Sequence, residues 1–433
     1  MGVASSMKKV IVRGPALSQS GYGEHTRFVL RSLQSKPELF DVYLLCTNWG
    51  ATGWIWEDNK EREWIDQLLQ KTIKYSQENN GGVGGVQFDI SVQVTIPNEW
   101  ERMAPINIGV TAGIETTKIA AVWVEKSLQM DKIIVVSEHA KYGFDNTEYQ
   151  AYNAQTDRHV EGGAKVTCQV DVVGYPVKEI EPAKLDLELK DDFNFLVVGT
   201  WIVRKNLENT IKWFVEEFYD QEVGLVVKTS HAKNCLRDRR FTHSRLGELL
   251  NEYKERKCSV YLLHGDMTEQ EMTGLYQHSK IKAFASLTHG EGFGLPLFEA
   301  VYNAVPVVCP AWGGQCDFLY MPVKNKGGKT KNTPMFTIVP YDVKPIQKEA
   351  IWEGVLQADS QWCFPKEWAY KKALRSVIKE YGSTKSKAKK LQKYVKKQFA
   401  QENQYQKFCN AIYEEKEFEV EKWLEDLDVK AYG

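Results

Sequence analysis

Short apolar, β-branched runs alternate along the chain with longer amphipathic stretches, a pattern typical of βαβ units and parallel sheets. Helical patterns at 25–33 and 64–75 separate such runs in the first part of the chain. The runs predict six strands there, at residues 10–13, 42–45, 88–94, 106–110, 132–136 and 169–173. The alternation favours an α/β domain built on a parallel sheet.

A second series of the same kind follows residues 178–192, a charged segment with Pro182 and little periodicity that we expect to be a linker. Helical patterns at 207–218 and 269–278 belong to this series. Its predicted strands are 195–198, 224–228, 259–263, 282–285, 305–308 and 336–339. We therefore expect α/β domains at 1–180 and 190–400, and a C-terminal helix at 401–433 that packs back on the first domain.

Composition excludes several classes of protein. The 433 residues carry 56 Lys+Arg against 57 Asp+Glu, so no global charge draws the chain to nucleic acid or acidic lipid. Its eight cysteines are scattered without a CxxC pair, which favours neither a zinc site nor a disulfide scaffold. No apolar run approaches the ~20 residues of a membrane span. We expect a soluble cytoplasmic protein without an integral membrane segment.

The most informative segment is HGEGFGLPLFEA at residues 289–300, between a predicted strand and a predicted helix. Gly292 and Gly294 permit positive φ and close backbone approach, so a ligand can lie against exposed N–H groups. Glu291 and Glu299 could bind hydroxyls on two parts of one ligand. Gly-rich turns between a strand and a helix are also common as plain structure, so the segment alone assigns no function.

With its flanks, AVPVV at 304–308 and the glycine pair at 313–314, the segment resembles the Glu-x7-Glu signature of group-1 (family four) retaining glycosyltransferases. VGTWIVRKN at 198–206 is similar to the opening of that family's second domain, and GPALSQSGYGEHTR at 14–27 to its first Gly-rich loop. The N-terminal stretch also looks like phage-encoded members. The resemblance implies the α/β GT-B fold, with two facing Rossmann-like domains, parallel sheets and a cleft between them.

The resemblance also implies the donor, a UDP- or GDP-sugar, and the residues that handle it. Lys205, helped by Arg204, would neutralise the leaving nucleoside diphosphate. Glu291 would hold hydroxyls of the transferred sugar, and Glu299 those of the ribose. The implied donor-binding residues further include Gly21, Gly23, Gly292, Phe293 and Gly294. Outside this context, Arg204 and Lys205 would be read as a solvated pair at a strand end.

The acceptor side departs from the family, whose members often carry a His that residues 109–113 lack here. Glu115, Thr116 or His139 could stand near the reacting sugar, although each is also a common structural residue. Retaining transfer in this fold is thought to proceed by front-face attack, with a leaving phosphate oxygen taking the acceptor proton. We therefore expect no cofactor, and no metal because no His/Asp/Glu cluster has ligand spacing.

The acceptor must be inferred from local surfaces. Residues 49–56 form an irregular Trp- and Gly-rich segment, and Trp54 could offer a flat ring to a sugar or base. Basic stretches at 228–245 and in a predicted loop at 323–332 would suit a polyanion. With the phage resemblance they suggest DNA bearing a hydroxymethylated pyrimidine, modified in a host cytoplasm. The alternatives are a surface-polysaccharide or lipid-linked acceptor, a non-catalytic nucleotide-sugar-binding protein, and a nucleotide-sugar epimerase of the same shape.

Overall fold

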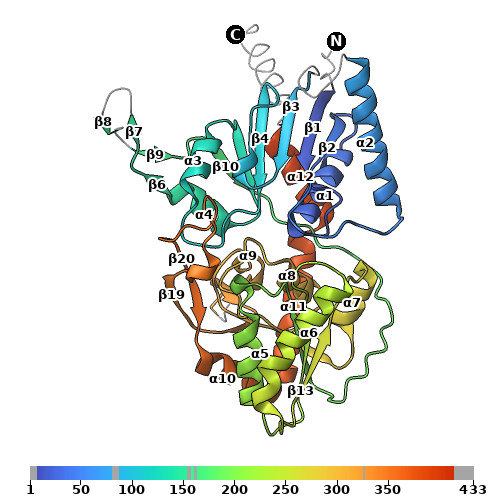
Figure 1. Ribbon diagram of the computed structural model, residues 1–433, viewed down its shortest axis with the longest axis vertical. Coiled ribbons are helices and arrows are strands. Elements are labelled where there is room, and N and C mark those ends of the chain that lie inside the picture. The colour runs from blue at the N-terminus through green and yellow to red at the C-terminus, as the bar shows by residue number, and fades with distance from the viewer. Residues whose placement is uncertain (1–6, 80–86, 154–157, 160–162, 325–326, 414–433) are drawn as a thin grey trace.

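The computed structural model describes residues 7–79, 87–153, 158–159, 163–324 and 327–413. Two lobes lie one above the other, each built on a six-stranded parallel sheet (Figure 1). We call the elements up to β10 together with helix α12 the N-terminal lobe, and the elements from β11 to α11 the C-terminal lobe. Every predicted strand is confirmed.

The N-terminal sheet has the strand order β10-β5-β4-β3-β1-β2, with every neighbouring pair parallel. Its strands are β1 (Lys8–Gly14), β2 (Phe40–Cys46), β3 (Ile90–Val94), β4 (Ile106–Thr111), β5 (Lys132–Val135) and β10 (Gln169–Val172). Its connecting helices are α1 (Gly21–Gln34), α2 (Lys60–Glu78), α3 (Ala121–Ser127) and α4 (Glu138–Asn146). Ser20 and Ser137 cap α1 and α4 by accepting from backbone N–H groups of their first turns.

The C-terminal sheet has the order β13-β12-β11-β14-β15-β18 and is also parallel throughout. Its strands are β11 (Asn194–Val198), β12 (Gly224–Lys228), β13 (Ser259–Leu263), β14 (Ile281–Ala285), β15 (Val307–Cys309) and β18 (Thr337–Ile338). The helices of this lobe are α5 (Leu207–Glu217), α6 (Leu236–Leu250), α7 (Glu269–Gln277), α8 (Leu295–Tyr302), α9 (Cys316–Leu319), α10 (Glu367–Lys379) and α11 (Tyr381–Gln398).

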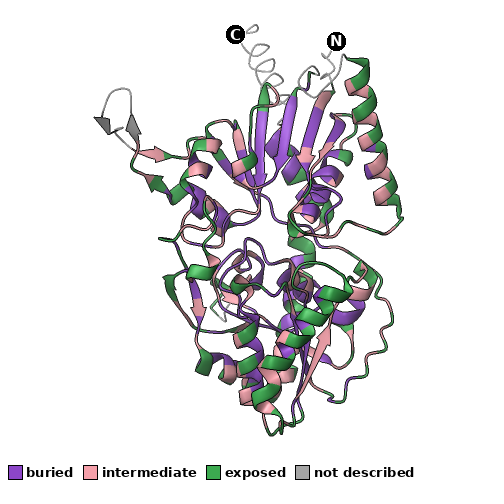
Figure 2. Cartoon of the chain, in the orientation of Figure 1, coloured by how far each residue is buried: buried purple, intermediate pink, exposed green. Residues whose placement is uncertain are grey.

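The central strands of both sheets are mostly buried, as expected for parallel sheets covered by helices (Figure 2). In β1, Val10 and Val12 enter the core beneath α1, whereas Ile11 packs with Tyr43 and Phe88 on the opposite face. This alternation explains why the strands read as continuous apolar runs in the sequence.

Antiparallel hairpins lie outside the two parallel sheets. The predicted loop at 323–332 is wrong in its described part, because β16 (Tyr320–Lys324) pairs with β17 (Thr330–Pro334). A second hairpin joins β19 (Tyr341–Pro345) to β20 (Gln361–Pro365). Two-residue strands form further pairs in the N-terminal lobe: β6 (Glu148–Tyr149) with β9 (Ala164–Lys165), and β7 (Tyr152–Asn153) with β8 (Arg158–His159).

The chain crosses between the lobes twice. The first crossing is the irregular segment 174–193, and the second is the junction between α11 and α12 (Gln401–Ile412). The two crossings touch, since the backbone N–H of Val177 donates to the carbonyl oxygen of Phe399 at 2.8 Å. Helix α12 then packs on α1, where Phe408 meets Phe28 with ring centres 5.5 Å apart. Residues 414–433 lie outside the described part, so of the expected terminal helix only α12 is seen.

Candidate functional site

Two cations and a carboxylate meet at the edge of the C-terminal sheet that faces the N-terminal lobe. Arg204 and Lys205 lie in a 3-10 turn, η2 (Val203–Lys205), shortly after β11. Glu291 follows the neighbouring parallel strand β14, so the carboxyl ends of both strands bring these residues together. The Nζ atom of Lys205 lies 2.6 Å from Oε1 of Glu291, and Nη1 of Arg204 lies 3.1 Å from Oε2.

This cluster is largely withdrawn from solvent. The side chain of Glu291 is 8% exposed and that of Lys205 is 14% exposed. Burial alone would raise the pKa of Glu291, but the Lys205 and Arg204 cations hold it below its ordinary value. Burial lowers the pKa of Lys205, whereas Glu115 and Glu291 outweigh burial and raise that of Arg204. The arrangement offers two closely spaced cationic groups to an anionic ligand.

The N-terminal lobe contributes Glu115, which follows β4 and reaches across to the cluster. Its Oε1 atom lies 3.2 Å from Nε of Arg204, and its carbonyl oxygen accepts a 3.3 Å hydrogen bond from the Trp312 indole. His139 packs edge-on against Trp312 at 5.3 Å between ring centres. Its buried Nε2 atom has no hydrogen-bond partner among the described residues, and burial lowers its pKa. Of the expected acceptor-side residues, Glu115 and His139 therefore lie beside the cluster.

The other two acceptor-side candidates lie elsewhere. Thr116 is 1% exposed, and its hydroxyl donates to the carbonyl oxygen of Lys118 at 3.1 Å, which is a structural contact. Trp54 is 55% exposed and pairs by an isolated bridge with Ser18, in the loop after β1. That loop leads into α1, so Trp54 stands on the same edge of the N-terminal sheet as Gly21.

The glycines of the motif are needed where the two lobes touch. A Cβ atom on Gly292 would lie 2.5 Å from the carbonyl oxygen of Ala112, and one on Gly290 would lie 2.6 Å from that of Glu115. Gly294 has φ of +96° and begins α8 in the left-handed conformation. These positions thus have a packing reason to be glycine that is independent of any ligand.

The first Gly-rich loop behaves differently at its two glycines. A Cβ atom on Gly23 would lie 1.9 Å from the carbonyl oxygen of Ser18, so this glycine lets the loop fold against α1. A Cβ atom on Gly21 would meet nothing within 4 Å. Gly21 is exposed and accessible to a ligand between the lobes, whereas Gly23 is buried.

The structure does not bring the side chain of Phe293 to the cluster. Its ring is 4% exposed and lies 5.0 Å, between ring centres, from both Tyr175 and Phe318. Since Gly292 and Gly294 carry no side chains, the intervening ring turns into the aromatic core between the lobes. Only the backbone of Phe293 remains available to a ligand.

Glu299 lies on α8, apart from the Lys205–Glu291 pair. Its Oε2 atom accepts a 2.9 Å hydrogen bond from the Tyr276 hydroxyl. Burial raises the pKa of Glu299 to about 7, and no cation pairs directly with it among the described residues. Of the two carboxyl groups of the motif, Glu299 is the one whose pKa is raised, whereas that of Glu291 is lowered.

A second charged group, which the sequence did not predict, joins the lobes at the first crossing. Lys178 lies 2.8 Å from Glu24 of α1 and also pairs with Glu269 of α7. Arg31 adds a 2.5 Å contact to Glu24. The cations keep the pKa of Glu24 well below its ordinary value despite burial, so this carboxylate is ionised.

Within the described ranges, no group of three or more His, Cys, Asp or Glu side chains could hold a metal ion. None of the helices in those ranges is long and apolar enough to cross a membrane.

The sequence matches no protein-family model and no curated protein. Among solved structures, sucrose-phosphate synthase from Thermosynechococcus elongatus superposes with a TM-score of 0.58 and 12% identity, over 93% of this chain and 98% of that one. Anabaena Alr3699/HepE, solved with UDP and glucose, gives 0.54 and 11% over 93% and 98%. The lipopolysaccharide outer core galactosyltransferase WaaB gives 0.51 and 12% over 94% and 99%.

Identities this low speak to the fold alone. Both lobes take part in each superposition, since more than nine-tenths of the chain is covered. Together with the two six-stranded parallel sheets, this establishes that the chain has the two-domain, Rossmann-like GT-B fold.

Proposed function

We propose that this protein is a glycosyltransferase that moves a sugar from a UDP- or GDP-sugar to an acceptor hydroxyl with retention of configuration. The proposal rests on one observation above the others: Lys205 and Arg204 converge on Glu291 at the sheet edge that faces the other lobe of a GT-B fold. The Anabaena protein of the same fold was solved with UDP and glucose, which supports a nucleotide-sugar donor.

The cluster fits the charge changes of the reaction. As the bond between the anomeric carbon and the diphosphate breaks, negative charge grows on the leaving phosphate, where Lys205 and Arg204 would stabilise it. The acceptor oxygen bonds to the anomeric carbon on the same face, and its proton passes to the leaving phosphate oxygen. Glu291 would bind hydroxyls of the transferred sugar and Glu299 those of the ribose. Because the two cations supply positive charge, we expect no metal requirement.

For the acceptor, we propose DNA bearing a hydroxymethylated pyrimidine, and a basic surface supports this choice. The first turns of α6 expose Arg237, Arg239 and Arg240, none of which has an ion-pair partner among the described residues. Asp238 accepts from the backbone N–H groups of 231–233, which fixes the preceding loop at the carboxyl end of β12. This basic surface therefore lies on the same sheet edge as Lys205 and could contact phosphates of a nucleic acid.

The competing acceptor is a glycan of the cell surface, free or lipid-linked. It is favoured by the similarity in fold to WaaB, a lipopolysaccharide galactosyltransferase. A protein that only binds nucleotide sugars and a nucleotide-sugar epimerase are the remaining alternatives. These functions differ in whether the donor is consumed or converted, and in what stimulates this change.

The test is release of nucleoside diphosphate from UDP-, GDP-, ADP- and TDP-sugars, with and without hydroxymethylcytosine-containing DNA. Release stimulated by modified DNA, together with sugar on the DNA, is the expected result. Slow release of nucleoside diphosphate at a rate that DNA does not change would overturn DNA as the acceptor and favour a glycan. No release from any donor would overturn the transferase itself.

The acceptor surface can be tested separately. Reversing the charge of α6 with Arg237→Glu and Arg240→Glu should abolish stimulation by DNA and leave basal donor hydrolysis unchanged, because the ion-pair partners of Glu291 are Arg204 and Lys205 and not these residues. Lys389→Glu with Lys390→Glu makes the same charge change on exposed positions of α11 and serves as the control. Equal effects of both pairs would show a general loss of charge rather than a specific surface.

A further inference from the structure

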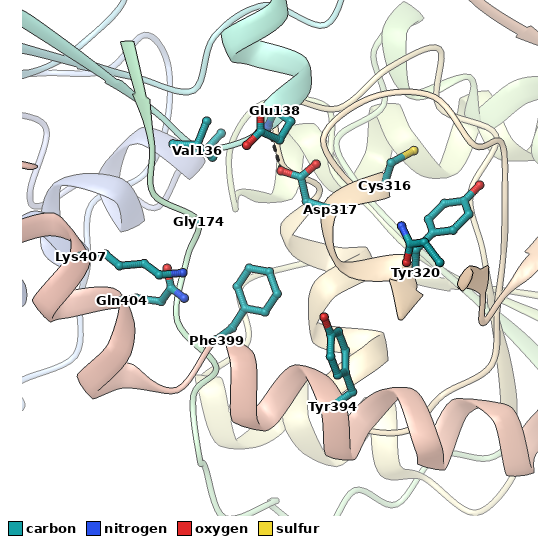
Figure 3. Close-up of a pocket in the computed structure, with 12 residues that line it drawn as sticks. Val136, Glu138, Gly174, Cys316, Asp317, Tyr320, Tyr394, Phe399, Gln404 and Lys407 are labelled. Atoms are coloured by element: carbon teal, nitrogen blue, oxygen red, sulfur yellow. Dashed lines mark hydrogen bonds between the residues drawn. The ribbon is translucent and has the colours of Figure 1, made fainter. Parts of the chain in front are cut away.

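A cavity of about 630 Å³ lies beside the crossing between α11 and α12 (Figure 3). Its size is within the usual range of small-molecule sites. Both lobes build it: Val136 and Glu138 come from the β5–α4 turn, and Asp317 from α9. The remaining residues that line it are Val172, Gly174, Cys316, Tyr320, Asn332, Tyr394, Phe399, Gln404 and Lys407.

The cavity and the Lys205–Glu291 cluster have no residue in common. They lie on opposite sides of one wall. Ser137, which precedes Glu138, donates from its hydroxyl to the carbonyl oxygen of Gly292 at 2.6 Å. On the other lobe, the backbone N–H of Gly314, close to Asp317, donates to the carbonyl oxygen of Glu291. The cavity thus lies behind the loop that carries Glu291.

Hydrogen-bonding groups occupy one side of the cavity. The backbone N–H of Glu138 donates to Oδ2 of Asp317 at 2.9 Å, and Figure 3 shows both carboxyl groups close together there. Burial raises the pKa of Asp317 to about 6. The Glu138 carboxylate itself has no partner among the described residues, so it can accept from a ligand.

Aromatic rings occupy the opposite side. The rings of Tyr394 and Phe399, from the last turns of α11, project into the cavity in Figure 3. Neither the Tyr394 hydroxyl nor that of Tyr320 has a hydrogen-bond partner among the described residues. This side of the cavity is therefore lined by aromatic carbon atoms, and the two Tyr hydroxyl groups are available to a ligand.

Gln404 completes the wall from α12. It is 1% exposed, and its Nε2 atom donates to the carbonyl oxygen of Gln398 at 3.1 Å. No donor in the described chain reaches its Oε1 atom, and the side chain points into the cavity in Figure 3. This amide oxygen is therefore available to a ligand that brings a hydroxyl or N–H donor. Lys407, one turn later on the same helix, adds an ammonium group.

We propose that this cavity binds a neutral, polyhydroxylated ring, a saccharide unit, as a site distinct from the donor site. An aromatic face on one side and carboxylate, amide and ammonium groups on the other match the apolar face and hydroxyl rim of a sugar. Two carboxyl groups against one ammonium group disfavour a phosphorylated or otherwise anionic ligand. A purely apolar ligand would displace water from the polar groups of Glu138 and Gln404 without replacing its hydrogen bonds, and is disfavoured for that reason.

A saccharide held there would contact Glu138 of one lobe and Asp317 of the other at the same time. Ligands favour the conformation that offers them more contacts. The bound sugar would therefore stabilise the arrangement in which the two lobes close on the Glu291 loop. This inference concerns binding and stands independently of the proposed transferase activity.

The test uses the full chain and titration calorimetry with glucose, galactose, N-acetylglucosamine, maltose and maltoheptaose, with glucose 6-phosphate as the anionic comparison. We expect a neutral saccharide to bind, and Tyr394→Ala or Glu138→Ala to weaken its affinity about tenfold or more. Lys205→Ala should not change that affinity. Tighter binding of maltoheptaose than of glucose would identify a sugar unit within a chain as the ligand. Tighter binding of glucose than of maltoheptaose would identify a free sugar.

Two matched variants control for nonspecific effects. Tyr142→Ala and Glu125→Ala remove exposed side chains of the same types from α4 and α3, outside the cavity. Thermal melting of each variant shows whether it folds. If Tyr394→Ala does not fold, Glu138→Gln tests the same cavity through a milder change at another lining residue. The proposal is overturned if no saccharide binds, if only Lys205→Ala removes binding, or if glucose 6-phosphate binds more tightly than glucose.

Discussion

The ammonium group of Lys205 lies 2.6 Å from the carboxylate of Glu291. Arg204 shares the same carboxylate at 3.1 Å and also reaches Glu115 of the other lobe. Carboxylates of both lobes thus hold the two cations in place. Under the proposed function, this arrangement would avoid the cost of orienting them during the reaction.

Substitution of Lys205 by Ala should reduce donor turnover about 10²- to 10³-fold, because one of the two groups proposed to stabilise the leaving diphosphate is lost. The measurement is nucleoside diphosphate release at saturating donor. Lys212→Ala, which removes a half-exposed Lys from α5, is the matched control and should keep full activity. Turnover that survives in Lys205→Ala would show that the donor phosphate binds elsewhere.

Glu299 should make the folded protein less stable as the pH rises from 4.5 to 7. Its pKa is about 7 in the folded chain against an ordinary 4.5, so the folded state binds the proton more tightly. The extra stability is therefore complete at low pH and is lost by pH 7, up to about 3 kcal/mol in free energy of unfolding.

In Glu299→Gln this loss should vanish, because the amide does not ionise and can still accept from the Tyr276 hydroxyl. Denaturant unfolding at pH 5 and pH 8 measures this change. The free energy of unfolding of the variant should match that of the parent at pH 5 and exceed it at pH 8. Glu402→Gln, on the exposed side of α12, is the control. A constant difference between parent and Glu299→Gln at both pH values would contradict a raised pKa.

Gly292→Ala should destabilise the protein by about 1–3 kcal/mol, because the new methyl group would lie 2.5 Å from the carbonyl oxygen of Ala112. Gly21→Ala is the same chemical change where nothing lies within 4 Å, so its melting temperature should be unchanged or higher. If donor binding nevertheless falls in Gly21→Ala, this glycine admits the ligand. Equal melting temperatures for both variants would be incompatible with the close approach of the lobes.

Trp54→Ala should leave stability within about 0.5 kcal/mol of the parent while reducing acceptor-dependent turnover several-fold, since the ring is 55% exposed. Trp123→Ala provides the contrast. That ring is fully buried and donates to Asn98, and its loss should lower the free energy of unfolding by about 3–5 kcal/mol. Unchanged acceptor use by Trp54→Ala would remove residues 49–56 from the acceptor surface.

The parallel sheets could be predicted from the sequence because their strands are buried on both faces and read as uninterrupted apolar runs. The β16–β17 hairpin could not, since Lys and Gly dominate its tip and the pairing of Tyr320 with Pro334 involves residues without an apolar alternation. Residues 341–345 do alternate, with Tyr341 and Val343 separated by Asp342, and this signal for β19 was available.

The part of the candidate site that short sequence segments form could be predicted from the sequence. The positions of Lys205, Arg204 and Glu291 follow from two neighbouring strand ends. The side-chain direction of Phe293 does not, because the sequence does not say which way a ring between two glycines turns. The contact of Lys178 with Glu24 was equally hidden, since it depends on how the first crossing lies against α1.

The packing of α12 on α1 has a consequence for synthesis. Phe408 and Cys409 fill the surface beneath Phe28 and Ser32, so the core of the N-terminal lobe is completed by almost the last described residues. Domains generally fold as units while the chain emerges from the ribosome, N-terminal parts first. In this protein, the N-terminal lobe is translated first but is completed last. The apolar surface of α1 that α12 covers stays exposed until the C-terminal lobe and α12 have been translated.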